Sequence, residues 1–302
     1  MQIYLPIAEM TVPVEAILIL GMVAGFFTSV FGVGGGFLTT PFLIFLGVPP
    51  SISVGTQANQ LVASSVSGSL IHWSRGNIDI KLGLTMLGGS VVGSLIGIGL
   101  FKILQHMGQI DAAINILYII LLGSIGTMML IESVYALLKK SPTEKGRPKF
   151  WVMLGERLPY KMHFPKSKMY ISACLPAGIG FLGGLITSLM GVGGGFFMVP
   201  AMIYILGMST IMVAGTSLFQ IMFTTIFSTI LHAVANHTVD LVLAVLLIVG
   251  GIIGSQIGVR AAKHIRGAPA RLMLAAMLII VAGKLSSDLF IPPYELFSMQ
   301  ER

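Results

Sequence analysis

Two long stretches of this sequence, residues 16–74 and 169–239, contain no Asp, Glu, Lys or Arg. Only 10% of the chain is charged, whereas soluble domains carry about a quarter charged residues. Several apolar runs approach the roughly 20 residues that a helix needs to cross a bilayer. These runs are continuous, and they do not alternate between apolar and polar residues as the strands of a membrane barrel would. The sequence therefore predicts an all-α integral membrane protein.

Cysteine and charge content narrow the class further. Cys174 is the single cysteine, which excludes an internal disulfide. The formal net charge is +7, and nine of the 18 basic residues lie between Lys139 and Lys168. A basic cluster beside membrane segments is a typical orientation signal, so we expect the lipid bilayer as a partner and no nucleic acid. The first residues include no basic n-region, which argues against a cleaved signal peptide.

The sequence contains an internal repeat. The stretch "FGVGGGFLTTP" begins at Phe31, and "MGVGGGFFMVP" begins at Met190, 159 residues later. With two single-residue insertions in the second copy, further matches follow in the same order: Gly55-Thr56 with Gly215-Thr216, Gln60 with Gln220, His72 with His232, and Asp79 with Asp240. Colinear matches over this distance indicate a duplication.

Each copy contains five apolar segments. We expect them near residues 14–31, 37–48, 54–73, 80–101 and 112–138, and then near 170–190, 196–208, 211–235, 239–262 and 269–291. The chain would then have three parts: an N-terminal membrane repeat at 1–138, a basic cytoplasmic linker at 139–169 and a C-terminal membrane repeat at 170–302.

Five is an odd number, so the second copy enters the membrane from the opposite side if every segment reverses the chain direction. The basic residues agree with this topology. The positive-inside rule makes the linker cytoplasmic and puts the loop at 260–271, which has four basic residues, on the same side. The matching loop at 102–111 falls outside, with only Lys102 and Asp111. We predict two inverted-topology repeats, multi-pass in the cell (inner) membrane, with both termini external.

The second segment of each copy is too short to span the membrane. About twelve residues give a helix of roughly 18 Å, against a core of about 30 Å. A short helix after a run of glycines indicates a broken helix whose start lies inside the membrane, lining a cavity. Helix N-termini bind anions through their free N–H groups. The substrate-binding residues expected at these breaks are Gly32, Gly34, Gly35, Gly36, Gly191, Gly193, Gly194 and Gly195, preceded by Thr28 and Thr187.

Close helix packing is the alternative use of glycine in membrane helices. We apply it to Gly89, Gly93 and Gly97 and to Gly250, Gly254 and Gly258, because their four-residue spacing places each set on one helix face. The GVGGG breaks do not continue that spacing and precede a short segment in both copies, which favours a functional role.

The third segments add polar residues that either line the same site or bond neighbouring helices. They are Thr56, Gln57 and Gln60 in the first copy and Thr216, Ser217 and Gln220 in the second. His72 and His232 are candidates for proton coupling. The sequence shows no catalytic constellation and no cluster of metal ligands, so we expect no catalytic residue, no cofactor and no metal.

The paired GVGGG breaks, the proline after each, the Gly-Thr of the third segment and the His-then-Asp region resemble the TauE/SafE family of membrane proteins. The resemblance covers both halves of the chain outside the linker. It implies a transporter of sulfite or of organosulfonates such as sulfoacetate, often an exporter, with the breaks at 32–36 and 191–195 as the site.

The charge-free stretches fit this implication. An anion bound there would be held by backbone N–H groups, hydroxyls and amides, which suits a sulfur oxyanion with several acceptor oxygens. The expected function is transport of a small anionic substrate by alternating access around this neutral site. The alternatives are a transporter of another small solute or a cation, and a membrane receptor or scaffold that docks through its basic linker. No feature of the sequence indicates an oligomeric state.

Overall fold

The structure, a computed structural model, describes residues 2–31, 35–139, 159–167, 169–236, 238–261 and 268–290. The first half contains β1 (Gln2–Leu5), β2 (Met10–Pro13), α1 (Val14–Phe31), α2 (Gly36–Phe45), α3 (Pro50–Ser74), α4 (Ile80–His106) and α5 (Ile110–Lys139). The second half contains β3 (Lys161–Phe164), β4 (Met169–Ser172), α7 (Cys174–Met190), α8 (Gly195–Ala201), the π-helix η1 (Met202–Leu206), α9 (Thr210–Leu231), the π-helix η2 (His232–Asn236), α10 (Leu241–Ala261) and α11 (Ala268–Phe290).

Each of the ten predicted segments corresponds to one helix, with η1 and η2 continuing α8 and α9. Within the described ranges, four helical stretches are long and apolar enough to cross a membrane by length and composition: residues 80–106, 110–131, 211–236 and 241–261. The sequence pattern does not predict the two antiparallel hairpins, β1–β2 and β3–β4, which precede α1 and α7. The second hairpin lies partly in the residues assigned above to the linker. The fold is therefore α-helical with two short β-hairpins added.

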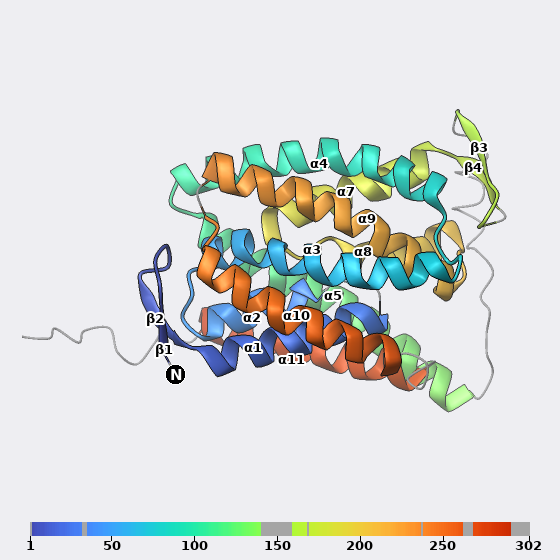
Figure 1. The fold of residues 1–302 in the computed structure, drawn as a ribbon. Helices are drawn as coiled ribbons and strands as arrows, with labels where there is room; N and C mark the ends of the chain where they lie inside the picture. Colours follow the sequence, from blue (N-terminus) through green and yellow to red (C-terminus); the bar gives the residue numbers. More distant parts are fainter. Residues whose placement is uncertain are drawn as a thin grey trace, which may run out of the picture.

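The two halves are interlocked. The largest helix contacts all join one half to the other: α1 packs on α10, α4 on α7, α3 on α9 and α5 on α11. By the repeat, α1 corresponds to α7 and α4 to α10, so the first two contacts are equivalent pairs. Figure 1 shows the helices lying side by side as a bundle, with the β1–β2 hairpin at one end and the β3–β4 hairpin at the other. Helices α1 and α7 therefore start from opposite ends of the bundle.

Glycines make the equivalent contacts close. A Cβ atom on Gly89 or Gly93 of α4 would collide with carbonyl oxygens of α7, and one on Gly254 or Gly258 of α10 would collide with those of α1. Two serines reinforce the α4–α7 contact: Ser90 donates to the carbonyl of Gly180 at 2.9 Å, and Ser94 donates to that of Gly184 at 3.2 Å. The packing role predicted for these glycines is confirmed.

Each hairpin is fixed to the other half by a buried aspartate. Asp79 begins α4, where its carboxylate accepts from Leu82 N–H, and it also accepts from the backbone and hydroxyl of Ser167 at 2.9 and 2.7 Å. Its counterpart Asp240 begins α10 and accepts from Ile7 N–H at 2.9 Å. One carboxylate therefore caps a helix and also anchors a hairpin, since it has enough lone pairs for both.

We predict that the close glycine contacts between helices stabilise the fold. Replacing Gly93 with Ala should lower the free energy of unfolding by about 1–3 kcal/mol, because the added methyl group would press on the carbonyl of Phe181. The matched control is Gly99→Ala on the same helix, where a Cβ atom meets nothing within 4 Å. Thermal unfolding of the purified protein in detergent measures both. Equal midpoints for the two variants would contradict the packing role.

Candidate functional site

The helices on either side of each glycine break end and begin where the sequence predicts. Helix α1 ends at Phe31 and α2 begins at Gly36, while α7 ends at Met190 and α8 begins at Gly195. Gly32 and Gly34 lie outside the described residues. In the second break Gly191, Gly193 and Gly194 have φ angles of 70°, 75° and 67°. This left-handed conformation is costly for residues with a Cβ atom, so the sharp path of this break requires glycine.

Gly35 and Gly194 pack back on the helix that precedes each break. A Cβ atom on Gly35 would collide with the carbonyl of Ala24, and one on Gly194 would lie 2.7 Å from that of Gly183. Thr28 and Thr187 donate to the same two carbonyls at 2.8 and 2.6 Å. The Thr28 hydroxyl also accepts from Gly35 N–H. In this structure the hydroxyl of Thr28 therefore bonds the first break directly, whereas the hydroxyl of Thr187 bonds within α7.

The two breaks meet each other in the middle of the bundle. A Cβ atom on Gly36 would lie 2.8 Å from the Cα of Val192, and the side-chain amide nitrogen of Gln57 is nearer still. The second break also runs along α3: a Cβ atom on Gly191 would lie 2.6 Å from the carbonyl oxygen of Val54, and one on Gly193 would lie 2.8 Å from Leu61. One face of α3 thus lies against the second break, with Gln57 at the point where the breaks touch.

Gln57 is the unusual polar group at this junction. Its side chain is fully buried, and its oxygen accepts from the Thr40 hydroxyl at 3.3 Å. Its amide nitrogen has no hydrogen-bond partner in the part of the chain that the structure describes. A buried donor without a partner costs about 1–3 kcal/mol. The described residues include twelve other buried side-chain atoms without a partner, so the position of Gln57 at the contact of the two breaks is what distinguishes it.

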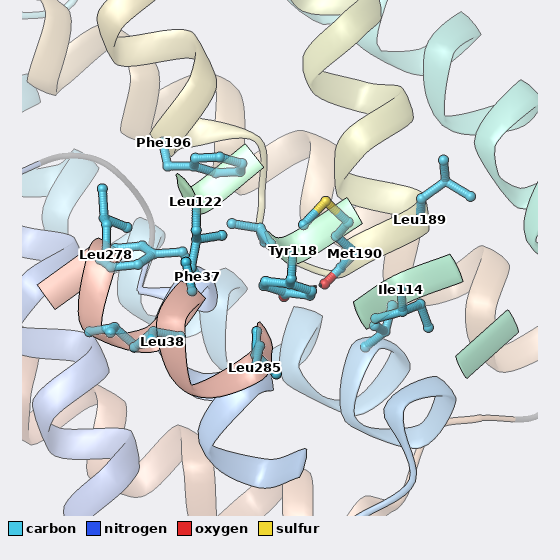
Figure 2. Close-up of a cluster of buried hydrophobic side chains, with 14 of the residues drawn as sticks. Phe37, Leu38, Ile114, Tyr118, Leu122, Leu189, Met190, Phe196, Leu278 and Leu285 are labelled. Atoms are coloured by element: carbon cyan, nitrogen blue, oxygen red, sulfur yellow. Dashed lines mark hydrogen bonds between the residues drawn. The ribbon is translucent and has the colours of Figure 1, made fainter. Parts of the chain in front are cut away.

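Tyr118 joins the junction from α5. Its hydroxyl donates to the carbonyl of Met190, the last residue of α7, at 2.7 Å. Figure 2 shows this tyrosine beside Met190, and the first aromatic residues of the two short helices, Phe37 and Phe196, near Leu122. One apolar cluster therefore surrounds the junction and contains residues from both halves. It excludes water, which strengthens every electrostatic interaction inside it.

Neither Thr40 nor Tyr118 is predicted as a site residue from the sequence. Each carries a hydroxyl inside an apolar run, and a buried tyrosine hydroxyl usually has a partner. That signal could point to Tyr118, but only the fold reveals that its partner is the carbonyl before the second break.

The polar residues predicted on the third segments mostly bond neighbouring helices. Thr56 accepts from Asp240 N–H at 2.9 Å, and Thr216 accepts from Asp79 N–H at 3.1 Å, so the two threonines brace equivalent helix starts. Ser217 donates to the carbonyl of Ala214 in its own helix.

The two matched glutamines, Gln60 and Gln220, also have partners on other helices. Gln220 donates to Ser90 of α4 and to Thr224 of α9. Gln60 accepts from Thr39 of α2 at 3.4 Å, and the same hydroxyl donates to the carbonyl of Gly35. Gln60 is therefore linked through Thr39 to the first break, whereas the amide nitrogen of Gln220 bonds α9 to α4.

The two matched histidines lie in different surroundings. His232 is fully buried in η2, where one ring nitrogen donates to the carbonyl of Ser188 at 2.9 Å and the other accepts from Asn236 at 3.1 Å. His72 is half-buried near the end of α3, close to Gly215. The described residues hold no group of His, Cys, Asp or Glu that could bind a metal ion.

Comparison with known proteins adds an independent finding. A probable membrane transporter protein of Bacillus subtilis, YjnA, is 26% identical over 270 residues, which cover 89% of this chain and 98% of that protein. A second one from the same organism, YunE, is 26% identical over 283 residues, covering 89% of this chain and 96% of YunE. A probable membrane transporter protein of Xylella fastidiosa is 26% identical over 271 residues, covering 86% and 92%. No solved structure matches the chain.

The family comparison agrees with the resemblance drawn from the glycine breaks. The match to the sulfite exporter TauE/SafE family extends from residue 17 to residue 285 and so includes both breaks, α3, α9 and Tyr118. The three relatives described above are named as probable membrane transporters and not as enzymes, as expected. The chain thus belongs to the sulfite exporter TauE/SafE family.

Proposed function

We propose that this protein exports a small sulfur-containing oxyanion, sulfite or an organosulfonate, through the junction of its two glycine breaks. The family description names sulfite export, and the relatives are named as probable membrane transporters. The observation that carries the proposal is the contact of Gly36 with Val192 beside the unpartnered amide nitrogen of Gln57. A donor fixed between two backbone breaks is a group that an oxyanion can pair with.

The chemistry of the junction is neutral. No Asp, Glu, Lys or Arg occurs in residues 16–74 or 169–239, which include both breaks and α3. An oxyanion would be held by the Gln57 amide and by N–H groups at the starts of α2 and α8, with no salt bridge. Neutral donors bind an anion weakly enough to release it, because no buried positive charge is left unpaired when the anion leaves.

We further propose that the halves are inverted in the membrane. Three observations support this: α1 and α7 start at opposite ends of the bundle (Figure 1), equivalent helices exchange partners between halves, and the basic linker follows α5. The two breaks then reach the junction from opposite sides. In this topology the linker is cytoplasmic and both termini are external, in the inner membrane.

Transport requires the junction to open. Gly36 and Val192 touch in the described arrangement, so an oxyanion fits between them only after the breaks separate. The glycines of the second break, in the left-handed conformation, provide a hinge next to the junction. Opening toward one side and then the other gives alternating access. An anion leaving the cell gains about 2.3 kcal/mol per 100 mV of inside-negative potential, so export proceeds without a coupled ion.

The first test concerns the amide of Gln57. Gln57→Leu keeps the approximate size of the side chain and removes the donor. Flux of sulfite from proteoliposomes should therefore fall by at least about tenfold, which corresponds to the loss of one hydrogen bond to a charged group. The matched control is Asn59→Leu on the same helix, since the Asn59 amide bonds back to Thr56 O at 3.2 Å and forms no hydrogen bond with the described residues of the breaks. Equal flux in both variants and the parent protein would exclude the junction as the site.

The second test concerns the orientation of that amide. Thr40→Val keeps the side-chain shape but removes the hydroxyl that bonds the Gln57 oxygen, so the amide can turn its oxygen toward the junction. We expect KM for sulfite to rise by about 2–10-fold, with a smaller change in kcat, because one hydrogen bond of about 0.5–1.5 kcal/mol is lost. Thr40→Ser retains the hydroxyl and should restore the parent KM. A KM for Thr40→Val that matches the parent protein contradicts the role of Thr40.

A further inference from the structure

The two hairpins share one architecture. Strand β1 pairs with β2 and β3 with β4 in equivalent registers, 159 residues apart. Buried, half-buried and exposed positions follow the same order along residues 2–8 and 161–167. The inward-facing residue at the end of the first strand is Leu5 in one hairpin and Phe164 in the other, and both are fully buried. The exposed side chains of the first strand and turn therefore occupy equivalent positions in the two hairpins.

Those exposed side chains differ in charge. Lys161, His163 and Lys166 are exposed on the second hairpin, and the residues at the same positions of the first hairpin are Gln2, Tyr4 and Ile7. The first hairpin adds an exposed acid, Glu9, in its turn. Both hairpins occupy an end of the bundle, beside the first helix of their half (Figure 1). One end thus presents a basic hairpin and the other a neutral or acidic one.

Neighbouring residues extend the basic surface around the β3–β4 hairpin. Lys81 at the start of α4 donates to the carbonyl of His163 at 2.9 Å, and its ammonium lies 5.9 Å from the centre of the Phe164 ring. Arg75 is exposed in the loop before α4. The nearby carboxylate of Asp79 is buried and saturated by Ser167 and Leu82, so it is not available to the exposed lysines.

Aromatic side chains place this surface at the depth of lipid headgroups. Tyr160, Tyr170 and Trp73 are 79%, 66% and 53% exposed. Exposed tyrosine and tryptophan at the ends of membrane helices are typical of the bilayer interface. The apolar face of α4 begins here with exposed Ile80 and Leu84, next to Lys81. Acyl chains can therefore lie along α4 while the headgroup reaches the lysines.

We propose that Lys81, Lys161 and Lys166 form a binding site for the phosphate headgroup of an anionic phospholipid, and that the β1–β2 hairpin forms no such site. Each lysine near an anionic bilayer surface contributes about 1 kcal/mol of attraction. Tyrosine hydroxyls at the hairpin supply further donors to phosphate oxygens. The site ties the β3–β4 hairpin, and through Asp79 the start of α4, to one leaflet. This proposal is independent of the transported solute.

The experiment measures retention of phosphatidylglycerol over phosphatidylcholine by the purified full chain, using native mass spectrometry from mixed micelles at low salt. Lys161→Gln/Lys166→Gln should weaken the preference about 30-fold, which is two lysines at about 1 kcal/mol each. The matched control Lys102→Gln/Lys284→Gln removes the same charge from other exposed positions, at the C-terminal ends of α4 and α11, and should keep the preference.

Salt and free phosphate complete the test. Raising the ionic strength should reduce the preference of the parent protein, because exposed charges are screened. Inorganic phosphate at the same phosphate concentration should compete poorly, because it has no acyl chain to lie along α4. Equal loss in both double variants, no preference in the parent protein, or full competition by inorganic phosphate would each overturn the lipid site.

Discussion

Backbone-to-backbone contact between the two halves governs this structure. In a bilayer, lipid tails are as apolar as the helices, so close packing and hydrogen bonds must hold helices together. Glycine supplies that closeness at α1–α10 and α4–α7, where side chains would collide with carbonyl oxygens of the partner helix. The breaks follow α1 and α7 directly, and Gly35 and Gly194 pack back on those helices. The crossing of the helices therefore sets where the breaks meet.

Polar groups are distributed unequally around that meeting point. Several buried hydroxyls and amides of α3 and α9 bond neighbouring helices, as Gln220 does with Ser90. The first half has Thr39 and Thr40 after its break, where the repeat puts Met198 and Val199 in the second. The side-chain donors at the junction consequently come from the first half, and the second half contributes a bent backbone. The two halves, although their sequences match, therefore differ in the polar side chains next to their breaks.

Much of this arrangement follows from the sequence, because continuous apolar runs and repeated glycines are local signals. The segment 14–31 coincides with α1, and the short helices begin within one residue of the predicted starts at 37 and 196. The hairpins escape notice because four-residue strands carry little pattern, although the offset of 159 also relates Pro6 to Pro165 and Met10 to Met169. Gln57 is predicted from the sequence, but its bond to Thr40 and the bond of Tyr118 to Met190 join segments far apart in the chain, which no local pattern encodes.

The interlocking of the halves also has a consequence for biogenesis. Helix α1 leaves the ribosome early, but its main partner, α10, follows only after most of the chain has been made. The glycine face of α1 therefore cannot make its contacts with α10 until the second half has been inserted into the membrane. Assembly is then a late event, and two fragments divided between α5 and α7 would still need each other to become a folded protein.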